Sequence, residues 1–363
     1  MSRSFSAPGR VNLIGEHTDY NEGFVFPAAI GFFTTVEITP RPDRTVHLES
    51  EHYPDTFSFP LDDSDARARH SWTDYAQGVA LALHHSGYPL TGANLSIRSD
   101  VPMGAGLSSS AALEVSCGLA LAAASGHAIS RLDLARVCLE AENEFVGMRC
   151  GIMDQFVSTH GREDSAILLD CRSLEYRVIH LPASVRLVIC NTMVKHQLAG
   201  SAYNERRRDC EAAARQMGVR SLRDVTAAMF AESSAALPAR AQLRARHVIG
   251  EIERTERAAE ALAAGDLTLF GRYMHESHES LREAYEVSCA ELDLMVELAR
   301  AQPGVHGSRM TGAGFGGCTI NLVDAPYVNQ FRREVAAAYR EATGIIPGIY
   351  VCRAVEGAHE ITT

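Results

Sequence analysis

A segment rich in glycine and serine, Val101–Ser110, constrains the fold of this chain more than any other stretch. Its glycines, Gly104 and Gly106, allow positive φ angles and a close approach of the backbone to another group. Three serines then lead into an alanine-rich run, 109–125, that predicts a helix. Free N–H groups and the helix dipole favour a phosphate at such a helix start, but a serine-capped helix without a ligand fits the same residues. No Gly-Lys-Ser/Thr follows, so the segment is not a Walker A loop.

A dense polar cluster follows the apolar stretch Asn12-Leu13-Ile14, which we expect to be a strand. The cluster consists of Glu16, His17, Asp19 and Asn21. Carboxylates and an imidazole can pair with neighbouring sugar hydroxyls in a fixed geometry. A polar surface turn explains the same residues equally well. A metal site is a third interpretation, although such tight clustering fits no ligand spacing typical of a metal.

The residues alone do not decide the roles of two further carboxylates. Asp154 follows Gly151 closely and lies among apolar residues. A carboxylate in that position is either a helix cap, which the residues alone favour, or an acid–base group. Glu142 lies in a helical pattern, where a solvated charge is the default interpretation.

A second glycine-rich segment, Gly312–Gly317, matches G-x-G-x-x-G. A dinucleotide fingerprint follows a strand and opens a helix, whereas here the strand-like stretch Thr319–Val323 comes after the glycines, late in the chain. We therefore exclude a dinucleotide site. A turn that packs close to a nucleotide or a substrate remains open.

Composition narrows the class of protein. Of the 363 residues, 46% are hydrophobic and 22% are charged, as in globular proteins, and the net charge of −11 argues against nucleic-acid and membrane partners. The nine cysteines form no C-x-x-C pair, which suggests reduced thiols, and the first ten residues lack the apolar core of a signal peptide. We expect a soluble cytoplasmic protein.

Periodicity and turn signals predict mixed helices and strands, with a soft domain boundary near Pro182 that separates 1–182 from 183–363. Expected strands are 34–39, 94–99, 167–169, 176–180, 185–190, 319–323 and 348–354. Expected helices are 72–86, 109–125, about 130–145, 202–217, several between 226 and 301, and 328–343.

Four ordered motifs together resemble the galactokinases, within the wider family of galactose, homoserine, mevalonate and phosphomevalonate (GHMP) kinases. They are Gly9–Tyr20, Gly104–Ala112, Gly151–Gln155 and Met310–Gly317. The resemblance covers most of the chain. It implies an α+β architecture with a ribosomal-S5-like N-terminal domain that contains a left-handed crossover, and a ferredoxin-like C-terminal domain. The active site would lie in the cleft between them.

The resemblance also implies roles for individual residues. Asp154 corresponds to the catalytic carboxylate and Arg10 to the partner that steadies it. Sugar contacts correspond to Glu16, His17, Thr18, Asp19, Gly151 and Tyr203. The ATP phosphate loop corresponds to Gly104, Ala105, Gly106, Leu107, Ser108, Ser109 and Ser110. Ser110 and Glu142 resemble ligands of Mg²⁺, a hard cation that prefers oxygen.

The implied reaction is phosphoryl transfer from ATP to the C1 hydroxyl of α-D-galactose, by a chain expected to be a monomer. Two alternatives stay open. One is another sugar 1-kinase, acting on N-acetylgalactosamine, arabinose or a related sugar. The other is a galactose sensor on the same fold that binds without turnover, although the intact run Ser108–Ser110 argues for catalysis.

Overall fold

The computed structural model describes residues 2–63, 65–195 and 199–362. Its largest sheet has six strands in the order β13-β1-β3-β6-β4-β5. Their bounds are β1 Arg3–Asn12, β3 Pro27–Pro40, β4 Thr45–Ser50, β5 Tyr53–Pro60, β6 Ala93–Ser99 and β13 His359–Ile361. Neighbours are antiparallel except for the parallel pair β4 and β6.

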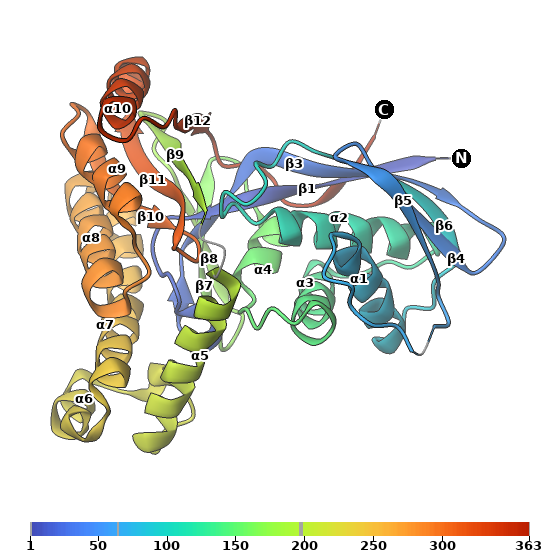
Figure 1. Cartoon of the computed structure of the whole chain (residues 1–363), viewed down its shortest axis with the longest axis horizontal. Coiled ribbons are helices and arrows are strands. Elements are labelled where there is room, and N and C mark those ends of the chain that lie inside the picture. The colour runs from blue at the N-terminus through green and yellow to red at the C-terminus, as the bar shows by residue number, and fades with distance from the viewer. Residues whose placement is uncertain (1, 64, 196–198, 363) are drawn as a thin grey trace.

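Four helices lie on one side of this sheet (Figure 1), with α2 and α4 against its strands and α1 and α3 packed on these two helices. They are α1 Thr73–His85, α2 Ser109–Ala124, α3 Arg131–Glu140 and α4 Met153–His160. Strand β6 shows why the chain folds this way: Leu95 and Ile97 are buried while Asn94 and Arg98 are exposed, the period of two that places apolar side chains on one face. These side chains join a core with α1 to α3.

The second large sheet is antiparallel, with the order β10-β11-β9-β12. Its strands are β9 Val185–Lys195, β10 Val305–Thr311, β11 Gly316–Asp324 and β12 Gly348–Cys352. Numbered along the chain, this is the order 4-1-3-2 of a ferredoxin-like βαββαβ unit. Three helices contact it, α8 Leu267–Ser280, α9 Ala290–Arg300 and α10 Val328–Thr343. The expected ferredoxin-like sheet is therefore present.

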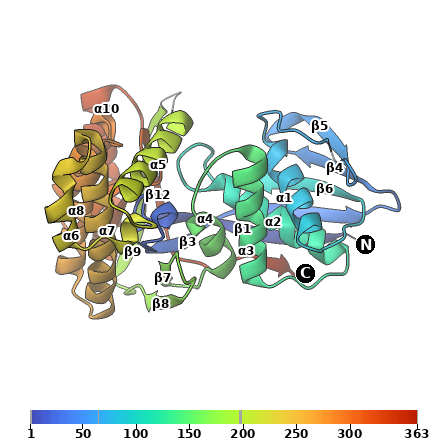
Figure 2. The same cartoon turned by 90° about the horizontal axis from the view of Figure 1, so that it is seen from below.

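The remaining elements connect the two sheets. Helix α7, Ala239–Ala263, packs on α8, and α5, Ala199–Gln216, packs on α7. Figure 2 shows these helices at one end of the molecule and α1 to α3 at the other. A small sheet contains β2 Phe24–Val25, β7 Ser165–Asp170 and β8 Tyr176–His180. Short segments are α6 Ala227–Ser233, 3-10 turns η1 Asp19–Asn21, η3 Leu222–Asp224, η4 Ser234–Ala236 and η6 Ala325–Tyr327, and π-helical turns η2 Ala141–Val146 and η5 Leu281–Tyr285.

The α+β class and most expected elements are confirmed, including the helix after the glycine-rich segment. The expected strand at residues 12–14 is wrong: β1 ends at Asn12, and Leu13 and Ile14 are buried in a bend. Their apolar character reflects burial beneath the following polar turn. Most of β1, strands β2, β4, β5, β10 and β13, and helix α4 were not predicted. The boundary near Pro182 stays a proposal, with the addition that β13 returns to pair with β1.

Close packing of α8 on β10 gives a stability prediction. A Cβ at Gly271 would lie 1.7 Å from the His306 carbonyl oxygen, whereas a Cβ at Gly250, on α7, meets only the end of the Arg254 side chain at 3.5 Å. We expect Gly271→Ala to lower the free energy of unfolding by about 3 kcal/mol, because backbone must shift. Gly250→Ala, the matched control, should be neutral or gain up to about 1 kcal/mol from helix propensity. Urea unfolding followed by circular dichroism measures both, and equal stabilities would contradict the packing.

Candidate active site

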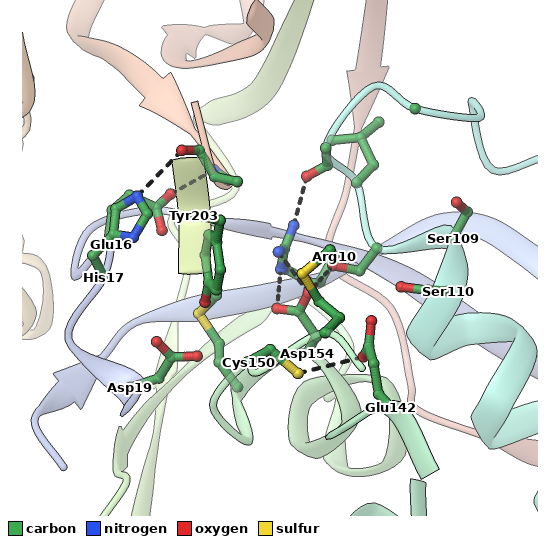
Figure 3. A pocket seen from close by; sticks show the side chains of 18 residues that line it. Arg10, Glu16, His17, Asp19, Ser109, Ser110, Glu142, Cys150, Asp154 and Tyr203 are labelled. Carbon is green, nitrogen blue, oxygen red and sulfur yellow. Dashed lines mark hydrogen bonds and ion pairs between the residues drawn. The ribbon is translucent and has the colours of Figure 1, made fainter. Parts of the chain in front are cut away.

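A cavity of about 280 Å³ brings together side chains from both halves of the chain (Figure 3). It lies where the end of β1, the start of α2, the start of α4 and the β10–β11 turn meet. Its lining consists of Arg10, Glu16, His17, Asp19, Gly104, Gly106, Leu107, Ser108, Ser109, Ser110, Glu142, Met148, Cys150, Met153, Asp154, Tyr203, Gly312 and Ala313. Most residues that the sequence singled out are therefore neighbours in space.

Arg10 and Asp154 form a bidentate ion pair at the floor of this cavity. Arg10 Nε and Nη2 each donate to one Asp154 carboxylate oxygen at 2.7 Å, and Nη1 donates to the Gly106 carbonyl at 2.7 Å. Burial disfavours the charged guanidinium, but Asp154, Glu16 and Asp19 outweigh it, so the pKa of Arg10 lies above its usual value. Asp154 lies in the first turn of α4 without capping it, since the helix begins at Met153 and the N-cap residue is Ile152. The residue is therefore held for its carboxylate rather than as a helix cap.

The loop Gly104–Ser110 is held against β1 and against a second loop. The Arg10 N–H donates to the Leu107 carbonyl at 3.0 Å. Ser108 has φ +58°, and its hydroxyl donates to Asp154. The Ser108 side chain thus orients the carboxylate and is already engaged. Ser109 and Ser110 begin α2, where the first N–H groups of a helix have no partner within the helix.

The β10–β11 turn packs backbone to backbone on that loop. Gly312 has φ +85°, and a Cβ there would lie 3.0 Å from the Gly106 carbonyl oxygen. A Cβ at Gly317, with φ +85°, would lie 3.2 Å from the Ala105 carbonyl oxygen. The glycines of the later motif are therefore needed for close approach to the earlier one, and strands flank the turn on both sides.

Asp19 presents a carboxylate to the cavity from the short turn η1 (Figure 3). Burial, and then the nearby Asp154, raise its pKa to about 6. Gly151 makes room for it, because a Cβ there would lie 2.4 Å from the Asp19 carboxyl group. Gly151 thus lies behind Asp19 rather than in the cavity wall, a role that no feature of the sequence indicated.

The other members of the polar cluster are largely occupied by protein partners. Glu16 accepts from Asn12 Nδ2 at 2.7 Å and from the Gly312 N–H at 2.8 Å, and it pairs with Arg309 at 3.4 Å. The Thr18 hydroxyl lies 2.8 Å from the Gly15 carbonyl and 2.6 Å from that of Phe24. Thr18 closes the turn and is not among the described residues that line the cavity.

His17 is buried with both ring nitrogens engaged. Nε2 lies 3.2 Å from the Ala313 carbonyl and therefore donates, while Nδ1 lies 2.8 Å from the Tyr20 hydroxyl and accepts. Burial, and then the neighbouring His247, lower its pKa to about 3. The ring also lies beside that of Tyr203, with centroids 5.4 Å apart and the planes tilted by 40°. His17 therefore offers this cavity a ring face rather than a free polar atom.

Glu142 and Ser110 face the cavity on the side opposite Asp19 (Figure 3). Glu142 is on the π-helical turn η2 and accepts from Gln155 Nε2 at 2.6 Å, and the Cys150 thiol lies 3.5 Å away. Burial, and then Asp154, raise the pKa of Glu142 to about 7, while Cys150, Gln155 and Ser110 oppose the shift. Within the described residues, no group of three or more His, Cys, Asp or Glu side chains is placed to hold a metal by itself.

Several contributors were missed from the sequence. Met148, Cys150 and Met153 line the cavity, and fully buried Arg309 holds Glu16. Arg309 stands in the same motif as Gly312, so its position offered a signal, but its partner is 293 residues away. Across the part of the chain that the structure covers, the helices lack the length and apolarity needed to cross a bilayer.

Comparison with known proteins identifies the family. Residues 2–40 match the galactokinase galactose-binding signature, 74–162 the GHMP kinases N terminal domain, and 258–341 the GHMP kinases C terminal domain. The chain is 48% identical to a galactokinase of Roseiflexus sp. (strain RS-1) over 360 residues, which is 98% of this chain and 92% of the relative. The chain belongs to the galactokinase family. A galactokinase of Chloroflexus aggregans is also 48% identical, over 98% of this chain and 93% of its own length.

Solved structures agree with this galactokinase assignment. The crystal structure of Lactococcus lactis galactokinase complexed with galactose superposes with a TM-score of 0.96 at 38% identity, over 99% of this chain and 95% of that one. The mevalonate kinase of Methanococcus jannaschii gives a TM-score of 0.69 at 17% identity, over 98% and 99% of the two chains. The latter shows that the GHMP kinase fold is shared. The resemblance read from the four motifs is thereby confirmed.

The neutral, buried His17 predicts acid sensitivity of this galactokinase fold. The unfolded chain takes up a proton at His17 below pH 6.5, whereas the folded chain does so only near pH 3, so the stability that His17 contributes is present above pH 6.5 and is lost as the pH falls. Between pH 7.5 and 5 this linkage costs about 2 kcal/mol for one histidine. Asparagine tolerates the φ angle of +64° at this position, so His17→Asn is a suitable variant. Between pH 7.5 and 5, we expect its free energy of unfolding to fall by about 2 kcal/mol less than that of wild type. Urea titrations at several pH values give the slopes, and parallel slopes would contradict a neutral His17.

Proposed function

We propose that this galactokinase transfers the γ-phosphoryl group of ATP to the C1 hydroxyl of α-D-galactose, forming galactose 1-phosphate and ADP. The observation that carries the proposal is the placement of Asp154. Its carboxylate is fixed by two hydrogen bonds from Arg10 and lies between the Asp19 carboxylate and the start of α2. A sugar hydroxyl and a phosphate have to meet at such a point for transfer to occur.

Asp19 and Tyr203 supply the sugar side in this proposal. Asp19 is an acceptor for a sugar hydroxyl, and a charged acceptor makes the stronger hydrogen bond. The Tyr203 ring, 5.5 Å from that of Tyr20, forms a wall of the same cavity. Glu16 and His17 are buried and their polar atoms have protein partners, so they act mainly by fixing the shape of this wall. Thr18 and Gly151 act from behind the wall.

The phosphate side consists of the loop Gly104–Ser110 and the start of α2. The N–H groups of the first helical turn and the helix dipole stabilise negative charge, and the serine hydroxyls can add donors. The loop has no lysine, so Arg10 contributes the nearby positive side chain. Because the transition state of phosphoryl transfer is loose, this positioning and charge stabilisation provide most of the rate enhancement.

Asp154 takes the proton released at C1. As the C1 oxygen bonds to the γ-phosphorus, the bond from that phosphorus to the bridging oxygen of ADP breaks, and the hydroxyl proton passes to the Asp154 carboxylate. The Arg10 contacts hold the carboxylate, and the Ser108 hydroxyl fixes its second oxygen. A carboxylate that is held in this way loses little entropy when it meets the sugar.

Ser110 and Glu142 suit Mg²⁺ by the chemistry of their donors. Both offer oxygen, and the raised pKa of Glu142 reflects burial beside Asp154 that a cation would offset. Two protein ligands suit an ion that keeps several waters and binds substrate phosphates. Bound there, Mg²⁺ would neutralise phosphate charge during transfer.

A coupled assay of ADP release tests the function. We expect turnover with galactose and Mg²⁺-ATP, and at least tenfold lower kcat/KM with N-acetylgalactosamine or arabinose. A better rate with either of those sugars would replace galactose as the substrate. Tight galactose binding without ADP release would instead identify a sensor.

Replacing the central carboxylate separates chemistry from binding. Asp154→Asn keeps the shape of the side chain but removes the proton acceptor, so we expect kcat to fall about 10³-fold. Galactose binding, measured by calorimetry, should change far less, and circular dichroism should report an intact fold. A rate within a factor of ten of wild type would refute the assigned role.

The raised pKa of Asp19 predicts pH-dependent sugar binding. With a pKa of about 6, Asp19 is charged at pH 7.5 and loses its charge as the pH falls through 6. We expect the galactose Kd, measured without nucleotide or metal, to rise several-fold between pH 7.5 and 5. Asp19→Asn should bind more weakly at pH 7.5 and show little change over that range. The same pH dependence in both proteins would contradict contact through Asp19.

A further inference from the structure

Helix α7 touches the turn that carries Asp19, from the side away from the cavity. His247 and Glu251, four residues apart on α7, lie on the same face of the helix. Glu251 Oε1 accepts from the Gly15 N–H at 3.1 Å, and His247 Nε2 lies 3.1 Å from the Glu16 carbonyl, to which it donates. Backbone groups of two consecutive residues of the turn are therefore bound by one helix face.

The turn fits closely against α7. Gly15 has φ +99°, and a Cβ there would lie 3.0 Å from Thr255 Oγ1, one helical turn beyond Glu251. At the other end of the turn, a Cβ at Gly23 would lie 2.6 Å from Ile252 Cγ1. The backbone of this segment thus rests directly on the helix, and a small displacement of α7 side chains would reach it.

Glu251 is fully buried and ionised. Burial alone would raise its pKa, but Arg254, His247 and Arg309 outweigh it and lower the pKa to about 2. Arg254 Nη1 and the Ser277 hydroxyl both donate to its carboxylate. Glu251 therefore joins α7, α8 and the turn in one hydrogen-bonded unit.

The link from Glu251 to the cavity runs through the turn itself. The Thr18 hydroxyl bonds the Gly15 carbonyl at 2.8 Å, so Gly15–Thr18 moves as a closed unit, and Asp19 follows directly. Among the described residues lining the cavity, neither Glu251 nor His247 appears. Glu251 therefore does not contact a ligand in the cavity, and its direct link to the site is the backbone that carries Asp19.

We propose that Glu251 is a positioning residue that sets galactose affinity by fixing the turn Gly15–Asp19 from behind. The inference rests on the proposed galactokinase activity and adds a determinant outside the cavity. None of the hydrogen bonds that Glu251 makes reaches the phosphate loop, so we expect the larger effect on the sugar.

Steady-state kinetics of Glu251→Gln test the proposal, with Glu260→Gln as the matched control on the exposed face of the same helix. Loss of the charge weakens the bonds from Arg254 and Gly15, because hydrogen bonds to charged groups are the stronger class. We expect the KM for galactose to rise about tenfold, while the KM for ATP and kcat stay within about threefold. Glu260→Gln should match wild type. A variant that only lost folded protein would lower the apparent kcat and leave the galactose KM unchanged, which would overturn the proposal.

A double-mutant cycle with Asp19→Asn tests the route. If Glu251 acts by placing Asp19, then Glu251→Gln should raise the galactose Kd by less than threefold in the Asp19→Asn background, against about tenfold in wild type. Equal effects in both backgrounds would overturn the proposed route. Calorimetric titration with galactose alone supplies these values, even where turnover is slow.

Ser277→Ala is the alternative test variant if Glu251→Gln folds poorly. It removes one donor to the carboxylate without removing the charge, and we expect a two- to fivefold rise in the galactose KM with the ATP KM unchanged. An unchanged galactose KM would overturn the proposal. If the proposed galactokinase function itself were wrong, the result would differ, because the wild-type protein would neither bind galactose nor release ADP in its presence.

Discussion

The ion pair between Arg10 and Asp154 is the interaction on which the rest of the site depends. It joins the end of β1 to the start of α4, and both oxygens of Asp154 are engaged by the guanidinium. A partly buried pair of this kind gains little net stability, because desolvation offsets the attraction. The pair instead fixes the position of the Asp154 carboxylate, with Asp19 on one side of it and Glu142 on the other. Ionising Asp19 or Glu142 places a second negative charge near Asp154 in a buried site. Burial and the Asp154 charge therefore raise the pKa values of Asp19 and Glu142.

Further hydrogen bonds and backbone contacts connect this ion pair to the rest of the site. Arg10 also binds the Gly106 carbonyl, and Gly106 in turn meets Gly312 backbone to backbone. Glu16 accepts from the Gly312 N–H, and α7 holds Glu16 and Gly15 from behind. Sugar turn, phosphate loop and β10–β11 turn are thus parts of one connected structure drawn from both halves of the chain. Substitutions outside the cavity can reach it by these contacts.

Much of the fold could be predicted from the sequence, and the failures have definite causes. Strand β6 was predictable because its alternation is local, and α2 because alanine-rich residues follow a serine run. Strand β10 was missed because Val305–Thr311 mixes glycine, serine and arginine, and its burial comes from α8 and β11. Residues 13 and 14 were misassigned because an apolar run signals burial without specifying backbone conformation. The return of β13 to β1 joins residues more than 350 positions apart, which no local pattern records.

The sequence by itself determined the chemical inventory: two glycine-rich turns, a serine-led helix start, a polar cluster and an aspartate among apolar residues, in an order that resembles the galactokinases. Only the tertiary structure decided which of these groups have polar atoms available to bind a ligand. It showed His17 and Glu16 bound to protein partners, Ser108 turned to Asp154, and Gly151 making room for Asp19. The physical reason is that a polar side chain offers a ligand only the lone pairs and protons that its buried neighbours leave exposed, and those neighbours come from distant parts of the chain.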